Sequence, residues 1–341
     1  MLDSTAWTLA IVVAGPALFA LAWALRAFLL ESRKDRVPAL LYHHFTSEQE
    51  RANQELSNYP AAYFCDDTSF DEQMNYLRRE GYTTISLDNF VAFQNGTQSL
   101  PPKPIILTFD DGFASNYLYA FPILKKYGMK ATVFVTVDPN CQNFRKYAKV
   151  DRCLTHAEIK EMSGQGISIE SHGVTHRYLS ALSTDVARWE LEESKRYLEK
   201  LLGKAVKYIA IPSGAYSRAV KRLVRESGYE GAFCMLKGTN SGISDRFALR
   251  RLVIGRDFDL EDFRRVLQPR AAFYLRLASS VQNALLTLLG PGGLDALRDR
   301  LYGFGLGSLL TRGQLKYFVP CLGVTALFFF VLLVLILQSH F

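Results

Sequence analysis

Short apolar runs alternate with longer amphipathic segments through most of the 341-residue chain. The short runs are predicted to be strands, and they cover residues 37–42, 83–86, 104–109, 130–137, 166–171, 208–211, 231–234 and 249–254. Segments with apolar residues at three- and four-residue spacing are predicted to be helices, and they cover residues 69–80, 87–94, 117–127, 155–163, 183–202, 218–227 and 260–267. This alternation of strand and helix favours an α/β fold with a mainly parallel barrel over a sandwich.

Local capping chemistry predicts where some of these helices begin and end. Ser69 is a candidate N-cap for the helix over residues 69–80. Thr155 and Glu158 have the spacing of a capping box at the start of the helix over residues 155–163. Gly203 follows the last apolar position of the long helix and is predicted to end it.

Both ends of the chain carry long apolar segments without charged side chains. Residues 7–25 and 317–337 are each long enough to span a bilayer. A cleavable signal peptide is the competing interpretation of the first segment, but no basic residue precedes it. A buried core helix is the competing interpretation of the second. Residues 269–315 have helical spacing and are predicted either to pack on the barrel or to lie in the membrane interface.

These patterns predict a chain with four parts. They are an N-terminal transmembrane helix with a basic flank (residues 1–36), a barrel domain (37–268), amphipathic interfacial helices (269–315) and a C-terminal transmembrane helix (316–341). Lys and Arg flank each predicted span only on the side of the barrel domain. The positive-inside rule therefore predicts a two-span inner-membrane protein with the barrel domain in the cytoplasm.

Two adjacent carboxylates end the apolar strand over residues 104–109. Asp110 and Asp111 are followed by Gly112, which allows the chain to turn sharply. In parallel α/β folds the chemistry lies at the carboxyl ends of the strands. Neighbouring side chains of an extended segment point in opposite directions, so the two aspartates are expected to have different roles. A solvated turn is the plainer interpretation of this motif when it is taken alone.

A second polar cluster follows the strand over residues 166–171. His172 and His176 are four residues apart, a spacing that places both imidazoles on one face of a helical turn. Taken alone, such a pair is more often a surface or core feature than a ligand pair. Together with Asp111 it supplies two nitrogens and one carboxylate, a ligand set that leaves coordination positions open for water and substrate. The two motifs together predict a metal site.

Three motifs, in the order in which they occur along the chain, resemble those of the polysaccharide deacetylases of the NodB-homology type. Residues 108–112 read TFDDG, and residues 171–176 read SHGVTH. Residues 37–44 read VPALLYHH, which is similar to the branch that de-N-acetylates poly-N-acetylglucosamine and carries its histidine motif at the front. The resemblance covers roughly residues 37–268. It implies a deformed, incomplete β/α barrel, here flanked by the predicted transmembrane helices.

The resemblance also implies a role for each motif residue. The residues that would bind a divalent metal are Asp111, His172 and His176, with zinc as the first choice and nickel or cobalt as alternatives. Asp110 would be the general base that takes a proton from water. His43 would be the general acid that protonates the departing amine, with His44 as the fallback. A buried core histidine is the alternative interpretation of His43.

The third motif departs from the pattern of the family. The family commonly has an arginine near a Pro-Tyr pair, and the backbone N–H of the tyrosine helps to bind the oxyanion. Here Ser213 stands in place of the tyrosine, and residues 208–216 contain no arginine. A backbone donor survives a change of side chain, so Ser213 remains a candidate for the oxyanion site, with Tyr216 beside it for substrate contact. Arg251 is the candidate substitute partner of the base Asp110.

Charge and cysteine content argue against other classes of protein. The net charge of +7 suits an anionic membrane surface, whereas the absence of a dense Lys/Arg stripe with interleaved aromatic residues argues against nucleic acid. The five cysteines include no Cys-x-x-Cys pair, which argues against a thiolate metal site. Their odd number favours thiols over a disulfide framework, although Cys141 and Cys153 could bridge a loop.

The sequence thus predicts a membrane-bound, metal-dependent de-N-acetylase. Its expected substrate is an N-acetylated amino sugar in an envelope polysaccharide or in a polyprenyl-linked precursor, and its expected partners are membrane lipid and proteins of polysaccharide synthesis or export. Most relatives in the branch work outside the cytoplasmic membrane, so the family and the flanking charges place the domain on opposite sides.

Two other functions compete with this prediction. A catalytically impaired module that binds or scaffolds polysaccharide is the alternative that the altered third motif supports. A two-histidine, one-carboxylate iron oxygenase would use the same ligand types. It would require a double-stranded β-helix, which the alternation of strand and helix opposes.

Overall fold

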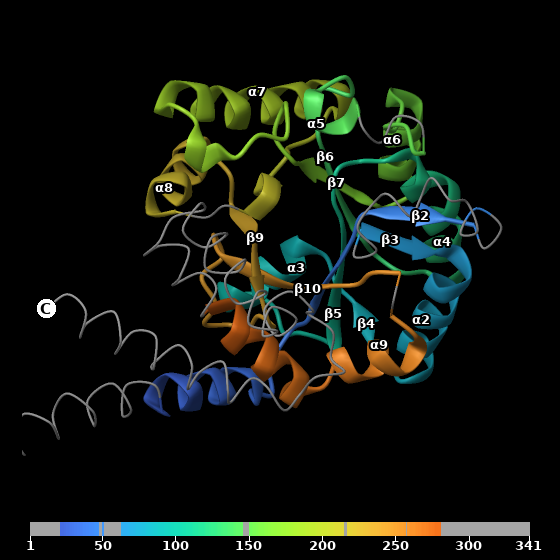
Figure 1. Ribbon diagram of the computed structural model, residues 1–341, viewed down its shortest axis with the longest axis vertical. Coiled ribbons are helices and arrows are strands. Elements are labelled where there is room, and N and C mark those ends of the chain that lie inside the picture. The colour runs from blue at the N-terminus through green and yellow to red at the C-terminus, as the bar shows by residue number, and fades with distance from the viewer. Residues whose placement is uncertain are drawn as a thin grey trace, which may run out of the picture. The chain divides into compact units, whose positions relative to one another are not determined.

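A seven-stranded parallel β-barrel lies at the centre of the larger part of the protein (Figure 1). The computed structural model describes residues 21–47, 50, 63–145, 150–214, 217–256 and 258–280. The chain divides into two compact units. Residues 34–267 form the unit that contains the barrel, and residues 1–33 and 268–341 belong to the other.

The strands of the barrel follow the order β1-β10-β9-β8-β7-β6-β5, and β1 closes the ring by pairing with both β10 and β5. Every pairing in this ring is parallel. The strands are β1 (Ala39–Tyr42), β5 (Pro104–Phe109), β6 (Thr132–Val135), β7 (Ser168–Ser171), β8 (Tyr208–Ala210), β9 (Gly231–Lys237) and β10 (Leu249–Val253). The predicted parallel barrel is therefore confirmed, with seven strands in the ring.

Three short strands lie outside the ring. β4 (Thr83–Thr84) pairs with the first residues of β5. β2 (His44–Thr46) and β3 (Phe64–Asp66) form a separate two-stranded parallel sheet. The sequence pattern predicted β4 but not β2 and β3, because three residues are too few for a periodicity to register.

Helices surround the barrel (Figure 1). They are α2 (Asp67–Arg79), α3 (Leu87–Gln94), α4 (Phe121–Tyr127), α5 (Gln142–Arg145), α6 (His156–Gly164), α7 (Thr184–Leu202), α8 (Arg218–Glu226) and α9 (Leu260–Val266). All six residues of β5 are buried, as expected for a parallel strand that is covered on both faces. The helices thus exclude water from the outer face of the barrel.

The interior of the barrel is packed with side chains from successive strands. Ile106, Phe134, Ala210, Phe233 and Leu249 belong to one buried cluster, and each comes from a different strand. In a parallel barrel such layers form a solid core and not a channel. The polar residues at the carboxyl ends of the strands therefore lie above an apolar floor.

The capping predictions have mixed outcomes. The capping box of Thr155 and Glu158 is confirmed at the start of α6. The predicted cap Ser69 is wrong, because α2 begins at Asp67 and the side chain of Asp66 accepts the hydrogen bond from the backbone N–H of Ser69. An aspartate is an equally good N-cap, and local sequence alone did not separate the two candidates.

In the second unit, the structure describes two helical segments, residues 21–31 and 269–280. Glu31 and Arg276 form a buried ion pair, and the rings of Phe28 and Phe273 meet edge to face at 6.0 Å. A buried charge requires a partner of opposite sign, so this pair fixes how the two segments pack.

The prediction of a two-span inner-membrane protein is not supported. Across the described residues between 21 and 280, no helix combines the length and the apolar character that crossing a bilayer requires. The predicted span over residues 317–337 and most of that over 7–25 lie outside the described residues, as does 281–315 of the predicted interfacial segment. An uncharged run establishes hydropathy, but a span needs one continuous apolar helix.

Glu158 provides a test of the capping box at α6. Arg152 lowers the pKa of the Glu158 carboxyl, burial opposes this, and hydrogen bonds from Thr155 help to bring the pKa to about 2. Because the folded pKa lies below the unfolded value of 4.5, the stabilisation is present above pH 4.5 and is lost as the pH falls towards 2. Glu158→Gln keeps the capping hydrogen bond but loses the charge pair.

We expect this variant to lose about 1 kcal/mol of unfolding free energy at neutral pH, and the deficit to shrink as the pH falls below 4.5. Urea unfolding of the wild type and the variant at a series of pH values measures both quantities. A deficit that stays constant over this range would contradict the assignment.

Candidate active site

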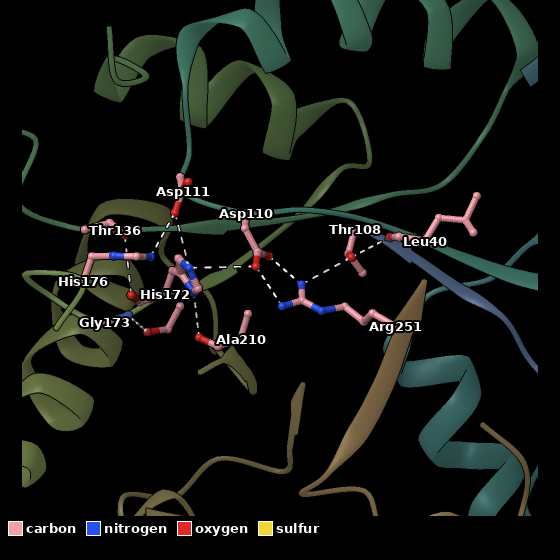
Figure 2. Close-up of polar contacts among 11 residues, drawn as sticks. Leu40, Thr108, Asp110, Asp111, Thr136, His172, Gly173, His176, Ala210 and Arg251 are labelled. Carbon is pink, nitrogen blue, oxygen red and sulfur yellow. Dashed lines mark hydrogen bonds and ion pairs between the residues drawn. The ribbon is translucent and has the colours of Figure 1, made fainter. Parts of the chain in front are cut away.

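Polar side chains from several strands meet at the carboxyl end of the barrel (Figure 2). Asp110 and Asp111 follow β5, His172 follows β7, His43 follows β1, and Arg251 lies in β10. Tyr42 at the end of β1 pairs with Phe109 at the end of β5, so the residues that follow the two strands lie side by side. The ring of parallel strands therefore brings these distant segments to one edge.

Asp111, His172 and His176 point toward one another (Figure 2). The Oδ1 atom of Asp111 lies 3.4 Å from Nε2 of His172 and 3.3 Å from Nε2 of His176. One candidate ligand atom from each residue lies within 4.8 Å of the other two. Oδ1 of Asp111 is buried and has no hydrogen-bond partner among the described residues. The three side chains thus have the composition and spacing of a metal site.

The two histidines converge through a non-helical turn, contrary to the helical turn that their spacing predicted. Residues 172–176 form no helix. His176 has a left-handed backbone (φ 54°), and Asp111 likewise (φ 76°). Such conformations are strained for residues with a Cβ and are enriched at functional sites. Two of the three side chains of the cluster, those of Asp111 and His176, are therefore oriented toward the cluster by a strained backbone.

The orientation of His172 is set by the neighbouring strand. Its Nδ1 lies 2.7 Å from the carbonyl oxygen of Ala210 at the end of β8. A carbonyl can only accept, so Nδ1 carries the proton, and in the neutral imidazole the lone pair is on Nε2, on the side of Asp111. This is the tautomer that a metal ligand needs.

Asp110 forms a bidentate ion pair with Arg251 (Figure 2). The two N–O distances are 2.6 and 2.7 Å, and both side chains are buried. Nη1 of Arg251 also approaches the hydroxyl of Thr108 at 3.5 Å, and that hydroxyl donates to the carbonyl of Leu40 at 2.6 Å. Arg251 thus contacts Asp110, the aspartate whose missing arginine partner it was predicted to replace, and its role in the reaction stays a prediction.

Opposing effects set the protonation of the two aspartates. Burial raises the pKa of Asp110, but Arg251 and His172 outweigh it and hold the pKa below its usual range. Burial likewise raises the pKa of Asp111, and His172 and His176 bring it well below the usual range. Both carboxylates are therefore ionised at neutral pH, as a metal ligand and a general base must be.

His43 lies near enough to the two aspartates for their charges to affect its pKa. Burial lowers its pKa to about 4, although the charges of Asp111 and Asp110 act in the opposite direction. Its Nδ1 is buried without a hydrogen-bond partner in the described part of the chain, and its ring meets that of Tyr63 edge to face at 4.9 Å. An imidazole with an unsatisfied buried nitrogen is not an ordinary core histidine.

His44, the fallback acid, is held in a different environment. Its Nδ1 lies 2.9 Å from Oδ2 of Asp151, and its ring stacks between those of Phe64 and Phe113. These contacts fix the imidazole in the packing of the β2–β3 sheet. They favour His43 over His44 as the histidine of the site.

The structure describes only part of the predicted oxyanion site. Ser213 lies in a single turn, Pro212–Gly214, directly after β8, and is exposed with a left-handed backbone (φ 54°). Tyr216 lies outside the described residues. The roles of Ser213 and Tyr216 therefore stay predictions.

Sequence reasoning missed one residue next to the site. Glu190 of α7 is fully buried, and its carboxylate accepts hydrogen bonds from the turn that joins His172 to His176. A glutamate in an amphipathic helix predicts a solvent-facing position, so the sequence held no signal for it.

A parallel barrel with an aspartate pair and two histidines at the carboxyl ends of its strands defines the NodB-like class of hydrolases. Residues 97–232 match the family described as polysaccharide deacetylase. These residues therefore carry a polysaccharide deacetylase domain. Relatives with this domain are named as N-deacetylases, which are hydrolases of carbon–nitrogen bonds other than peptide bonds.

Named relatives agree with this assignment. YxkH of Bacillus subtilis is 27% identical over 226 residues, which are 66% of this chain and 74% of the relative. The poly-β-1,6-N-acetyl-D-glucosamine N-deacetylase of Staphylococcus epidermidis is 24% identical over 247 residues, which are 67% of this chain and 82% of the relative.

Solved structures share the fold. The deacetylase PplD of Streptococcus pyogenes, solved in complex with acetate, matches with a TM-score of 0.61 and 28% identity over 70% of this chain and 100% of PplD. IcaB of Ammonifex degensii matches with a TM-score of 0.57 and 23% identity over 70% of this chain and 98% of IcaB, which is evidence for the fold alone.

The two adjacent aspartates can be separated by their effect on metal binding. Asp111→Asn removes the carboxylate that the two imidazoles face, so we expect zinc affinity to fall by at least ~100-fold. Asp110→Asn leaves the three candidate ligands in place and should change the affinity by less than ~10-fold. Chelator competition on the purified chain measures both, with circular dichroism to check folding. Equal zinc affinity in Asp111→Asn and the wild type would refute the assignment.

Proposed function

We propose that this chain is a metal-dependent de-N-acetylase that removes acetyl groups from N-acetylglucosamine units of a polysaccharide. The observation that carries the proposal is the convergence of Asp111, His172 and His176 beside an ionised Asp110 that is held by Arg251. The name of the Staphylococcus epidermidis relative supports a poly-β-1,6-N-acetylglucosamine type of polymer. The same name favours a polymer over a lipid-linked precursor as the substrate.

The residues of the site have separate roles in the proposed amide hydrolysis. Asp111, His172 and His176 would hold a divalent metal, for which we propose zinc, with nickel or cobalt as alternatives. When bound, such an ion lowers the pKa of a water ligand to about 7 and polarises a carbonyl. Asp110 is ionised and can take the proton of the attacking water. The bidentate contact with Arg251 holds Asp110 in one orientation for this transfer.

His43 is proposed to protonate the departing amine. Its lowered pKa means that it is neutral at rest at pH 7. It would therefore first take up the proton that Asp110 removes from water and then pass that proton to the amine nitrogen as the carbon–nitrogen bond breaks. The charges of Asp110 and Asp111 raise the pKa of His43 and so favour this uptake. The backbone N–H of Ser213 is proposed to donate to the developing oxyanion, since it follows the strand end beside His172.

A non-catalytic polysaccharide-binding module is the second candidate function. The exposed Ser213 in place of the family's tyrosine is the observation that favours it. The buried pair of Asp110 and Arg251 argues for the enzyme, because a binding module has no need of an oriented, ionised carboxylate. Proteins of polysaccharide synthesis or export remain predicted partners.

Acetate release tests the proposal directly. We expect the purified protein to release acetate from a poly-β-1,6-N-acetylglucosamine oligomer, and the rate to fall to background with a chelator and to recover with zinc. Asp110→Asn should lower the rate by ~10²–10⁴-fold, since it removes the proton acceptor. Release that is insensitive to chelator, or full activity in Asp110→Asn, would refute the mechanism. Metal binding without release from any N-acetylglucosamine polymer would favour the binding module.

His43→Gln tests the assignment of the acid. The glutamine cannot deliver a proton to the amine, so kcat should fall by ~10²–10⁴-fold while zinc affinity stays within a few-fold. His156→Gln is the matched control, because that histidine is exposed on α6 and bonds only to the hydroxyl of Tyr197 in the contacts described. Equal activity of His43→Gln and His156→Gln would contradict the role of His43.

A further inference from the structure

We propose that Glu190 is the positioning residue that sets His176 for metal binding. The proposal rests on the metal site described above and assigns a role to a helix residue that is remote from it in sequence. Glu190 lies in α7 and is fully buried. A buried carboxylate is costly unless several donors satisfy it, so its partners indicate what it organises.

In the described part of the chain, the hydrogen-bond partners of Glu190 lie in the turn that carries the two histidines and directly after it. Oε2 accepts from the backbone N–H groups of Val174 and Thr175 at 2.8 and 2.9 Å. Oε1 accepts a short hydrogen bond from the hydroxyl of Thr175 and further bonds from the guanidinium of Arg177 at 3.2 and 3.3 Å. One side chain thus satisfies the donors on both sides of His176.

The other face of the turn is also fixed. The carbonyls of Gly173 and Val174 accept from the backbone N–H groups of Val137 and Asp138 at 3.1 and 2.9 Å. A Cβ at Gly173, which has φ 78°, would contact Oε2 of Glu190 at 3.4 Å. The turn is therefore clamped between the segment after β6 and the carboxylate of Glu190 (Gly173 is labelled in Figure 2).

The clamp explains how His176 keeps an unfavourable backbone. His176 has φ 54°, a left-handed backbone conformation that is strained for a residue with a Cβ. Hydrogen bonds to a charged acceptor are about twice as strong as neutral ones, so those of Glu190 can offset this strain. Without them the turn would relax, and Nε2 of His176 would leave its position 3.3 Å from Oδ1 of Asp111.

Glu190→Gln tests this role. The amide keeps one acceptor oxygen for the backbone donors but turns an NH₂ group toward Arg177. We expect the zinc affinity to fall by ~10–100-fold, the range seen for outer-sphere partners of metal ligands. The zinc affinity is measured by chelator competition on the full chain. Urea unfolding at the same temperature checks that the variant is folded.

Glu199→Gln is the matched control on the same helix. Glu199 accepts from the backbone N–H of Val206 at 3.1 Å and pairs with Lys195, but it lies about 14 Å further along α7. This control should lose stability with no change in zinc affinity. A zinc affinity of Glu190→Gln within about threefold of the wild type, or an equal loss in Glu199→Gln, would overturn the proposal.

If Glu190→Gln does not fold, Thr175→Val is the variant that tests the proposal. It removes one hydroxyl donor to Oε1 and should weaken zinc binding several-fold, whereas unchanged affinity would overturn the proposal. The result is separable from that of the proposed function. A wild type that binds zinc but releases no acetate would refute the de-N-acetylase and leave the role of Glu190 standing.

Discussion

Closure of the barrel at β1 is the constraint on which the rest of the site depends. β1 pairs with β5 on one side and with β10 on the other, so a strand near the start of the domain holds together strands from its middle and its end. The aspartates follow β5, and the arginine lies in β10. Their bidentate contact spans 141 residues of sequence and exists only because the ring closes.

Burial gives the charges of this site their properties. Asp110 and Arg251 are both removed from water, and each would be strongly destabilising without the other. In such surroundings a carboxylate keeps its charge only next to a cation, and its position is fixed by the two parallel hydrogen bonds. Asp111 differs, because imidazoles and not a guanidinium face it, which leaves an oxygen available. Adjacent residues of one type thus acquire different chemistry from their partners.

The sequence predicted the parts of this arrangement that are local. The strand–helix alternation predicted the barrel. Asp110 and Asp111 directly follow one strand, and His172 and His176 stand in the short segment after another. Arg251 could only be guessed, because its contact depends on ring closure. Glu190 left no signal, since its burial results from a turn packing on α7. The membrane spans were predicted from hydropathy, which does not report whether one continuous helix forms.

The left-handed backbones of Asp111 and His176 carry a further consequence for the evolution of the domain. Glycine is the residue that would relieve the strain at either position, and selection for a more stable fold would favour it there. The same replacement would delete an oxygen or a nitrogen donor. Stability of the fold and retention of the candidate ligands thus oppose each other at these two positions. Glycine at either one would relieve the strain but would remove one of the three side chains that could hold a metal.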